Sequence, residues 1–124
     1  MYREDMESSL YLYMHIRVNN IDWQIIFTSN VNDLSTSSGN VTIGVTDNNT
    51  NTIYLYEKLR GKLLRKVLVH ELTHAWIFSY GYYLTVEEEE FVCSFVDTYA
   101  EEIIFESENL LNYFRKTYLH SHRK

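Results

Sequence analysis

Apolar and polar residues alternate along the first half of the chain. Residues 10–18 carry an apolar side chain at every second position, and the stretch IDWQIIF continues this pattern after the turn-forming pair Asn19 and Asn20. Such alternation is typical of strands with one buried face, and the short turn between them indicates a hairpin. VTIGVT at 41–46 and TIYLY at 52–56 form a second such pair around the Asn-rich turn DNNTN. The sequence thus predicts a small antiparallel sheet.

The period changes to that of a helix after Tyr56. Apolar residues then recur every three or four positions from Leu59 to Phe78, which is the signature of one buried helical face. Gly81 is suited to end this helix, because glycine readily adopts the left-handed conformation found just beyond a helix C-terminus. The polar segment 29–40 is long for a turn, and we expect a surface loop that could flank a cleft.

A second helix is predicted after a capping-box pattern. Thr85 and Glu88 are three apart, the spacing at which each side chain caps the backbone N–H of the other residue. We expect this helix to cover about 86–105, and a shorter one to cover 108–118. With a small antiparallel sheet packed against the first helix and a glutamate-bearing helix following it, the fold class is α+β, in a single domain of residues 1–124.

Net charge and composition exclude several classes of partner. A formal net charge of −6 argues against a nucleic-acid partner, because neutralising phosphates requires a clustered excess of Lys and Arg. We interpret the cluster Arg60, Lys62, Arg65 and Lys66 as a solvated helix face. The chain contains no apolar run of the roughly 20 residues that cross a bilayer, so no membrane partner is expected. A single cysteine, Cys93, agrees with a reducing compartment, and we expect a cytoplasmic protein.

The candidate chemistry lies in residues 70–74, which read HELTH. On a helix, residues four apart face the same way, so His70 and His74 can direct two imidazoles at one cation, with Glu71 beside them. A catalytic zinc site uses three protein ligands and one water, whose pKa the metal lowers so that the water can attack a carbonyl. Glu71 would act as the general base. The alternative is that both histidines are ordinary helix residues in a metal-free domain.

A third ligand must come from elsewhere in the chain. The metzincin pattern is excluded, because Ile77 and Tyr80 stand where it requires Gly and His. The run EEEE at 87–90 offers four glutamates, and the apolar period of the following helix directs Glu89 towards the core, with Glu90 at the edge of that face. Glu89 is therefore the predicted third ligand and Glu90 the alternative.

VLVHELTHAWIFSYG followed by EEEEFVCSFVDTYAEEI resembles the gluzincin peptidases, in particular small phage and prophage metallopeptidase-like proteins and, more distantly, the ImmA/IrrE peptidases. The resemblance covers roughly residues 41–104 and implies a minimal zincin-like domain. It implies one Zn²⁺ bound by His70, His74 and Glu89, with Glu71 as general base and acid, and hydrolysis of an intracellular protein or peptide.

The same resemblance implies a supporting polar residue four positions after the ligand glutamate, where this chain has Cys93, or Ser94 if Glu90 is the ligand. It also implies that an edge strand within residues 42–56 holds the peptide. A tyrosine is expected to stabilise the transition state, and four are candidates: Tyr54, Tyr80, Tyr82 and Tyr83. We interpret Cys93 itself as a small core residue. The alternative function is a binding module that keeps the zinc fold and cleaves nothing.

Overall fold

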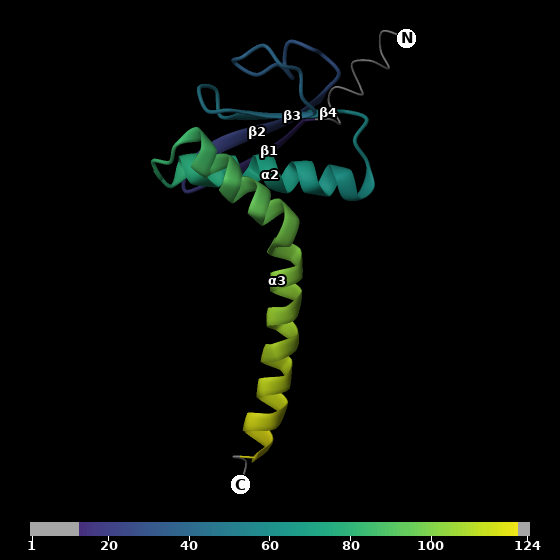
Figure 1. The fold of residues 1–124 in the computed structure, drawn as a ribbon, viewed down its shortest axis with the longest axis vertical. Helices are drawn as coiled ribbons and strands as arrows, with labels where there is room; N and C mark the ends of the chain where they lie inside the picture. Colours follow the sequence, from purple (N-terminus) through teal and green to yellow (C-terminus); the bar gives the residue numbers. More distant parts are fainter. Residues whose placement is uncertain (1–12, 122–124) are drawn as a thin grey trace.

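Four strands and then two helices make up the part of the chain that this computed structural model describes, residues 13–121 (Figure 1). The fold class is α+β, as the sequence predicts. The elements in chain order are β1 (Tyr13–Val18), β2 (Ile21–Thr28), β3 (Gly44–Asp47), β4 (Thr52–Tyr56), α2 (Gly61–Ser79) and α3 (Val86–Ser121).

The sheet is mixed, with strand order β1-β2-β4-β3. Both predicted hairpins are present as antiparallel pairs, but the central strands β2 and β4 run parallel, with Phe27 opposite Leu55. An entirely antiparallel sheet is therefore not what forms. Alternation along a strand shows which face is buried but carries no information on which strand becomes its neighbour. Here the loop after β2 takes the chain past the sheet, so that β3 lies at the edge and β4 returns beside β2.

The turn between β1 and β2 has the geometry of a two-residue hairpin. Asn19 and Asn20 both have positive φ, 49° and 65°, and Val18 pairs with Ile21 across the turn. Asparagine tolerates this left-handed conformation better than most residues, which is why the Asn-Asn pair marked the turn in the sequence. The expected start of β1 near residue 10 lies outside the described residues.

The core lies between one face of the sheet and α2. Trp23, Ile53 and Leu55 are completely buried there, and Ala75 of α2 lies against them with no exposed surface. Trp23 also donates a hydrogen bond from Nε1 to Ser79 Oγ at 2.8 Å, which ties the sheet to the last turn of α2. A buried indole N–H needs such a partner.

Replacing Ser79 by Ala should therefore lower the free energy of unfolding by roughly 1–3 kcal/mol, because the Trp23 N–H would remain buried without its acceptor. Urea denaturation followed by tryptophan fluorescence measures this change. Ser107→Ala is the matched control, since the exposed Ser107 hydroxyl only bonds the Ile103 carbonyl of its own helix. Equal stability of Ser79→Ala and the wild type would contradict the assigned role of this hydrogen bond.

Both predicted signals between the helices are confirmed. Gly81 has φ 75°, its N–H bonds the Phe78 carbonyl, and the Tyr82 N–H bonds the Ile77 carbonyl, the pattern of a Schellman motif. At the start of α3, the Glu88 N–H donates to Thr85 Oγ1 while the Thr85 N–H donates to Glu88 Oε1, which completes the capping box.

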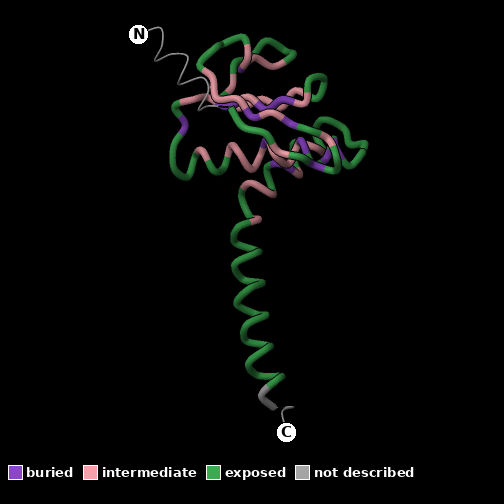
Figure 2. Tube along the Cα trace, turned by 180° about the vertical axis from the view of Figure 1, so that it is seen from behind, coloured by how far each residue is buried: buried purple, intermediate pink, exposed green. Residues whose placement is uncertain are grey.

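Helix α3 is one continuous helix of 36 residues, not the two helices expected. The residues around 105–108 (FESE) contain neither proline nor glycine, so nothing in the backbone interrupts it. Its first part crosses α2, and the rest projects away from the sheet with exposed residues on all sides (Figures 1 and 2). Within residues 13–121, neither helix combines the length and apolar character that crossing a membrane requires.

Part of the basic cluster on α2 contacts α3 instead of facing only solvent. Arg65 forms an ion pair with Glu101, and Lys66 forms one with Asp97. Asp97 is the buried member of these pairs, with a side chain that is only 6% exposed. The ion pairs lie where α3 crosses α2, and this crossing determines which α3 side chains reach the HELTH motif.

Candidate metal centre

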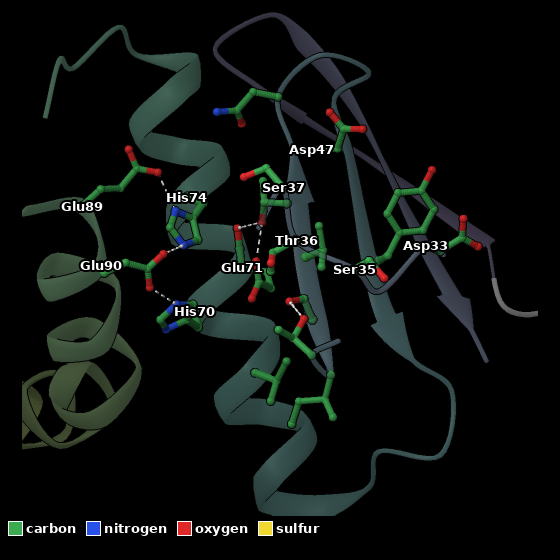
Figure 3. Close-up of a pocket in the computed structure, with 18 of the residues that line it drawn as sticks. Asp33, Ser35, Thr36, Ser37, Asp47, His70, Glu71, His74, Glu89 and Glu90 are labelled. Carbon is green, nitrogen blue, oxygen red and sulfur yellow. Dashed lines mark hydrogen bonds and ion pairs between the residues drawn. The ribbon is translucent and has the colours of Figure 1, made fainter. Parts of the chain in front are cut away.

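His70, Glu71 and His74 of HELTH lie on the face of α2 that meets the edge of the sheet and the start of α3 (Figure 3). The rings of His70 and His74 are neighbours, with centroids 5.1 Å apart, as expected for residues four apart on a helix. Their side chains are 21% and 12% exposed, so each imidazole has one side available to the cleft.

One carboxylate faces the Nε2 atoms of both histidines. Glu90 Oε1 lies 3.1 Å from His70 Nε2, and Glu90 Oε2 lies 3.1 Å from His74 Nε2 (Figure 3). Two imidazole nitrogens and one carboxylate therefore converge on a common point. Glu90 is about half exposed, which leaves that point open to solvent.

The Nδ1 atoms of both rings have their own carboxylate partners. His70 Nδ1 is 2.7 Å from Asp97 Oδ2, and His74 Nδ1 is 2.5 Å from Glu89 Oε2. In metal sites, a carboxylate on the second ring nitrogen fixes the tautomer and orientation of a ligating histidine. Here both rings are held so that Nε2 is the nitrogen presented to a ligand.

Glu89, the third ligand predicted from the sequence, thus contacts Nδ1 of His74. The alternative, Glu90, faces the Nε2 atoms of both histidines. The apolar face of α3 does pack inward in its first part, where Val92, Cys93, Val96 and Ala100 are buried or half-buried, and it becomes exposed at Tyr99 and Ile103. Glu89 points inward as predicted, with a side chain that is 24% exposed, against 53% for Glu90. Glu90, at the edge of this face, is nevertheless the carboxylate that reaches both Nε2 atoms.

Asp97 is a site residue that the sequence reasoning missed. The supporting residue was expected at Cys93 or Ser94, four positions after the glutamate, whereas Asp97 stands seven after Glu90. Seven residues are about two helical turns, so Glu90 and Asp97 share one face of α3. This spacing was the signal available in the sequence.

Cys93 of α3 lies close to both histidines. It is fully buried, and its Sγ, one ring nitrogen of His70 and one ring nitrogen of His74 all lie within 4.8 Å of one another. Burial raises the pKa of the Cys93 thiol to about 12, and the nearby Glu90 and Glu89 carboxylates act in the same direction. The thiol is thus a buried core group, as the sequence predicts, but it is also within reach of the histidine pair.

Glu71 points from α2 towards β3 and is only 7% exposed. The Thr46 hydroxyl donates to Glu71 Oε1 at 2.6 Å, so β3 holds one oxygen of this carboxylate. Burial raises the pKa of Glu71, and the Thr46 hydrogen bond and the two histidines only partly oppose it. A carboxylate with a raised pKa is suited to exchange a proton near neutral pH.

Gly44 allows β3 to approach Glu71 this closely. A Cβ atom on Gly44 would lie 2.7 Å from Val67 Cγ1 and 3.0 Å from Glu71 Oε2, closer than van der Waals contact permits. The absence of a side chain at this position therefore sets the distance between the edge strand and the motif helix.

Gly44→Ala should push β3 and the Glu71 side chain away from each other. It should lower the free energy of unfolding by about 1–3 kcal/mol, the usual cost of overpacking. The change can be measured by urea denaturation, and a crystal structure would show the shifted carboxylate. The control is Thr42→Ser, which keeps the hydroxyl. Gly39→Ser cannot serve, because Gly39 has φ 89° and a side chain there would strain the backbone. Unchanged stability and geometry in Gly44→Ala would show that the strand is not tightly packed here.

The charges around the two histidines favour a bound cation. Burial lowers the pKa of His70, but its hydrogen bond with Asp97 and the charges of Glu71 and Glu90 outweigh burial and raise it. Burial would raise the pKa of Asp97, yet hydrogen bonds from Lys66 and His70 lower it. Carboxylates crowd both sides of the histidines, and a divalent cation would neutralise them. Two imidazoles and a carboxylate form the ligand set of a His₂Glu zinc site, so these residues fit Zn²⁺.

A cleft of about 1180 Å³ opens over this centre and runs along β3. The motif residues line one part of it, Leu84 and Val86 line another, and the loop after β2 borders it with Ser35 and Thr36. The expectation that the polar loop of 29–40 flanks a cleft is confirmed. β3 is the edge strand, so its outer backbone edge faces this space.

Of the four tyrosines proposed for transition-state stabilisation, Tyr54 lines the cleft. Burial raises its pKa, and the charges of Asp33 and Asp47 raise it further. The other three, Tyr80, Tyr82 and Tyr83, lie in the exposed turn between α2 and α3 and are not among the residues that line the cleft.

Comparisons with known protein families, with curated proteins and with solved structures found no match to this chain. The geometry of His70, Glu71, His74, Glu90 and Asp97 is therefore the basis for a functional conclusion.

Proposed function

We propose that the protein is a zinc-dependent metallopeptidase. The single observation that favours this function most is the position of Glu90, whose two carboxylate oxygens each lie 3.1 Å from the Nε2 atom of one motif histidine. A buried glutamate, Glu71, lies beside them with a raised pKa. This combination is expected of a catalytic His₂Glu centre and has no evident role in a purely structural helix pair.

In this proposal His70 and His74 would hold zinc through Nε2 and Glu90 would be the third ligand, with Glu89 and Asp97 orienting the two rings. Zinc bound there would supply Lewis-acid chemistry, lowering the pKa of a water and polarising a carbonyl. Because Glu71 Oε1 accepts the Thr46 hydrogen bond, Oε2 would be the oxygen that takes a proton from water and delivers it to the leaving amine.

The free edge of β3 is suited to hold the substrate. The Ile43 carbonyl accepts a hydrogen bond from the Tyr56 N–H, so the alternation of an antiparallel ladder directs the backbone groups of Gly44 and Thr46 outward. An extended peptide could pair with these groups and cross the centre beside Glu71. The substrate would be an intracellular protein or peptide, and the cytoplasmic location expected from the sequence stays a prediction.

A peptide library incubated with the zinc-loaded protein tests this function. Mass spectrometry should detect cleaved products, and 1,10-phenanthroline should prevent their formation. Absence of cleavage across a library that covers all residue pairs, by a protein shown to contain zinc, would contradict the peptidase proposal.

A second candidate, a zinc-containing binding module without activity, is favoured by Cys93. If its sulfur within 4.8 Å of the histidine nitrogens became the fourth ligand, the site would be closed to water, as structural zinc sites are. Cobalt substitution separates the two candidates. A thiolate-to-cobalt charge-transfer band that disappears in Cys93→Ser would indicate the closed site, and a spectrum unchanged by that substitution would indicate the open, catalytic one.

A further inference from the structure

The outer part of α3 contacts α2 through the ion pair of Glu101 with Arg65, and the rest of it lies outside the packed part of the molecule (Figure 1). Every residue of 101–119 is exposed, a length of about 28 Å of helix. Figure 2 shows this segment extending away from the sheet and α2. A helix of this length without tertiary packing is only marginally stable in water, because most helical stability in proteins comes from burying an apolar face.

This segment nevertheless carries an apolar face. Six large side chains recur at helical spacing on one side of it and are 45–69% exposed, and we call them the C-terminal stripe: Ile103, Ile104, Leu110, Leu111, Tyr113 and Phe114. Side chains of this size and exposure leave roughly 100 Å² each open to solvent. Burying the stripe on two copies would remove on the order of 1,200 Å², which is within the range of specific protein interfaces.

The charges of α3 are segregated along its length. Every Asp, Glu, Lys or Arg from Glu87 to Glu108 is acidic, whereas the two that follow within the helix, Arg115 and Lys116, are basic. Two such helices attract each other when they lie antiparallel, since the acidic part of one then faces the basic end of the other. A parallel pair would place like charges together.

We propose that α3 pairs with α3 of a second copy as an antiparallel dimer, with the two-fold axis near Leu111. The C-terminal stripes of the two copies then pack together at the centre. Glu108 and Arg115 share one flank of the stripe, so Glu108 of each copy lies opposite Arg115 of the other, which gives two symmetric ion pairs. The two sheet-bearing ends lie at opposite ends of the paired helices, so both clefts remain open and the dimer is independent of the proposed peptidase activity.

Multi-angle light scattering of the full chain tests the dimer. The wild type should have twice the 14.9 kDa mass of one chain. Leu110→Glu should weaken association at least about a hundredfold, because each dimer loses this contact twice. Leu110 is 69% exposed in the single chain, so this change should not disturb its fold. Asn112→Glu is the matched control, since Asn112 lies about 200° around the helix from Leu110 and should leave the mass unchanged.

Charge exchange tests the direction of pairing. Glu108→Lys and Arg115→Glu should each weaken association several-fold, and the double variant should recover wild-type association, because the opposite charges face each other again. A monomeric wild type at about 100 µM, or a dimer unaffected by Leu110→Glu, would overturn the proposed dimer and leave the stripe to another partner. Failure of the double variant to recover would overturn the antiparallel arrangement.

Discussion

Glu71→Gln should lower the rate of peptide hydrolysis by a factor of about 10²–10⁴ while zinc remains bound. Glutamine has nearly the same shape and can still accept the Thr46 hydrogen bond through its amide oxygen, but it cannot take a proton from water. The loss should therefore appear in kcat and not in metal content. Cleavage of a fluorogenic peptide, selected from the library, measures the rate.

Glu87→Gln is the matched control for this prediction, since Glu87 is an exposed residue in the first turn of α3. It should retain full activity. If Glu71→Gln kept wild-type activity, Glu71 would not be the base. If a biological effect of the protein persisted in Glu71→Gln without any hydrolysis, the protein would act as a binding module.

Glu90→Gln should weaken zinc binding, and its loss of affinity should exceed that of Glu89→Gln by at least about tenfold. Glu90 contributes two oxygens, each of which faces one of the two Nε2 atoms, whereas Glu89 only orients His74 through Nδ1. Loss of an orienting partner usually costs 10–100-fold in metal affinity, and loss of a ligand costs more. Asp97→Asn, which removes the partner of His70 Nδ1, should resemble Glu89→Gln.

Competition with a chromophoric chelator measures the zinc affinities of the three variants. Glu88→Gln is not a suitable control, because Glu88 belongs to the capping box. Glu102→Gln, on the exposed part of α3, provides the control and should bind zinc like the wild type. A greater loss in Glu89→Gln than in Glu90→Gln would instead support the ligand set first expected from the sequence.

The features that follow from local sequence were predictable. The Asn19–Asn20 turn, the end of α2 at Gly81 and the capping box of Thr85 and Glu88 each depend on a few neighbouring residues, and the structure has all of them. The α+β class and the placement of His70 and His74 on one helical face, four residues apart, depend on the same kind of local pattern.

The features that depend on contacts between distant segments were not predictable in this way. The parallel pairing of β2 with β4 depends on the path of the intervening loop, which alternation does not encode. The apolar period placed Glu89 inward and Glu90 at the edge of the same face, but which of these two carboxylates reaches the Nε2 atoms depends on how α3 crosses α2. The same crossing brings Asp97 to His70.

Metal content of the purified, untagged protein is the first experiment to perform, using elemental analysis of wild type, His74→Ala and His15→Ala. His15 belongs to β1 and lies outside the centre, so it controls for the loss of a histidine. A zinc site formed by His70, His74 and Glu90 predicts about one zinc per chain in wild type and His15→Ala, and none in His74→Ala. Wild-type protein without zinc, even after zinc is added, or His74→Ala protein that retains it, would contradict the proposed metal centre.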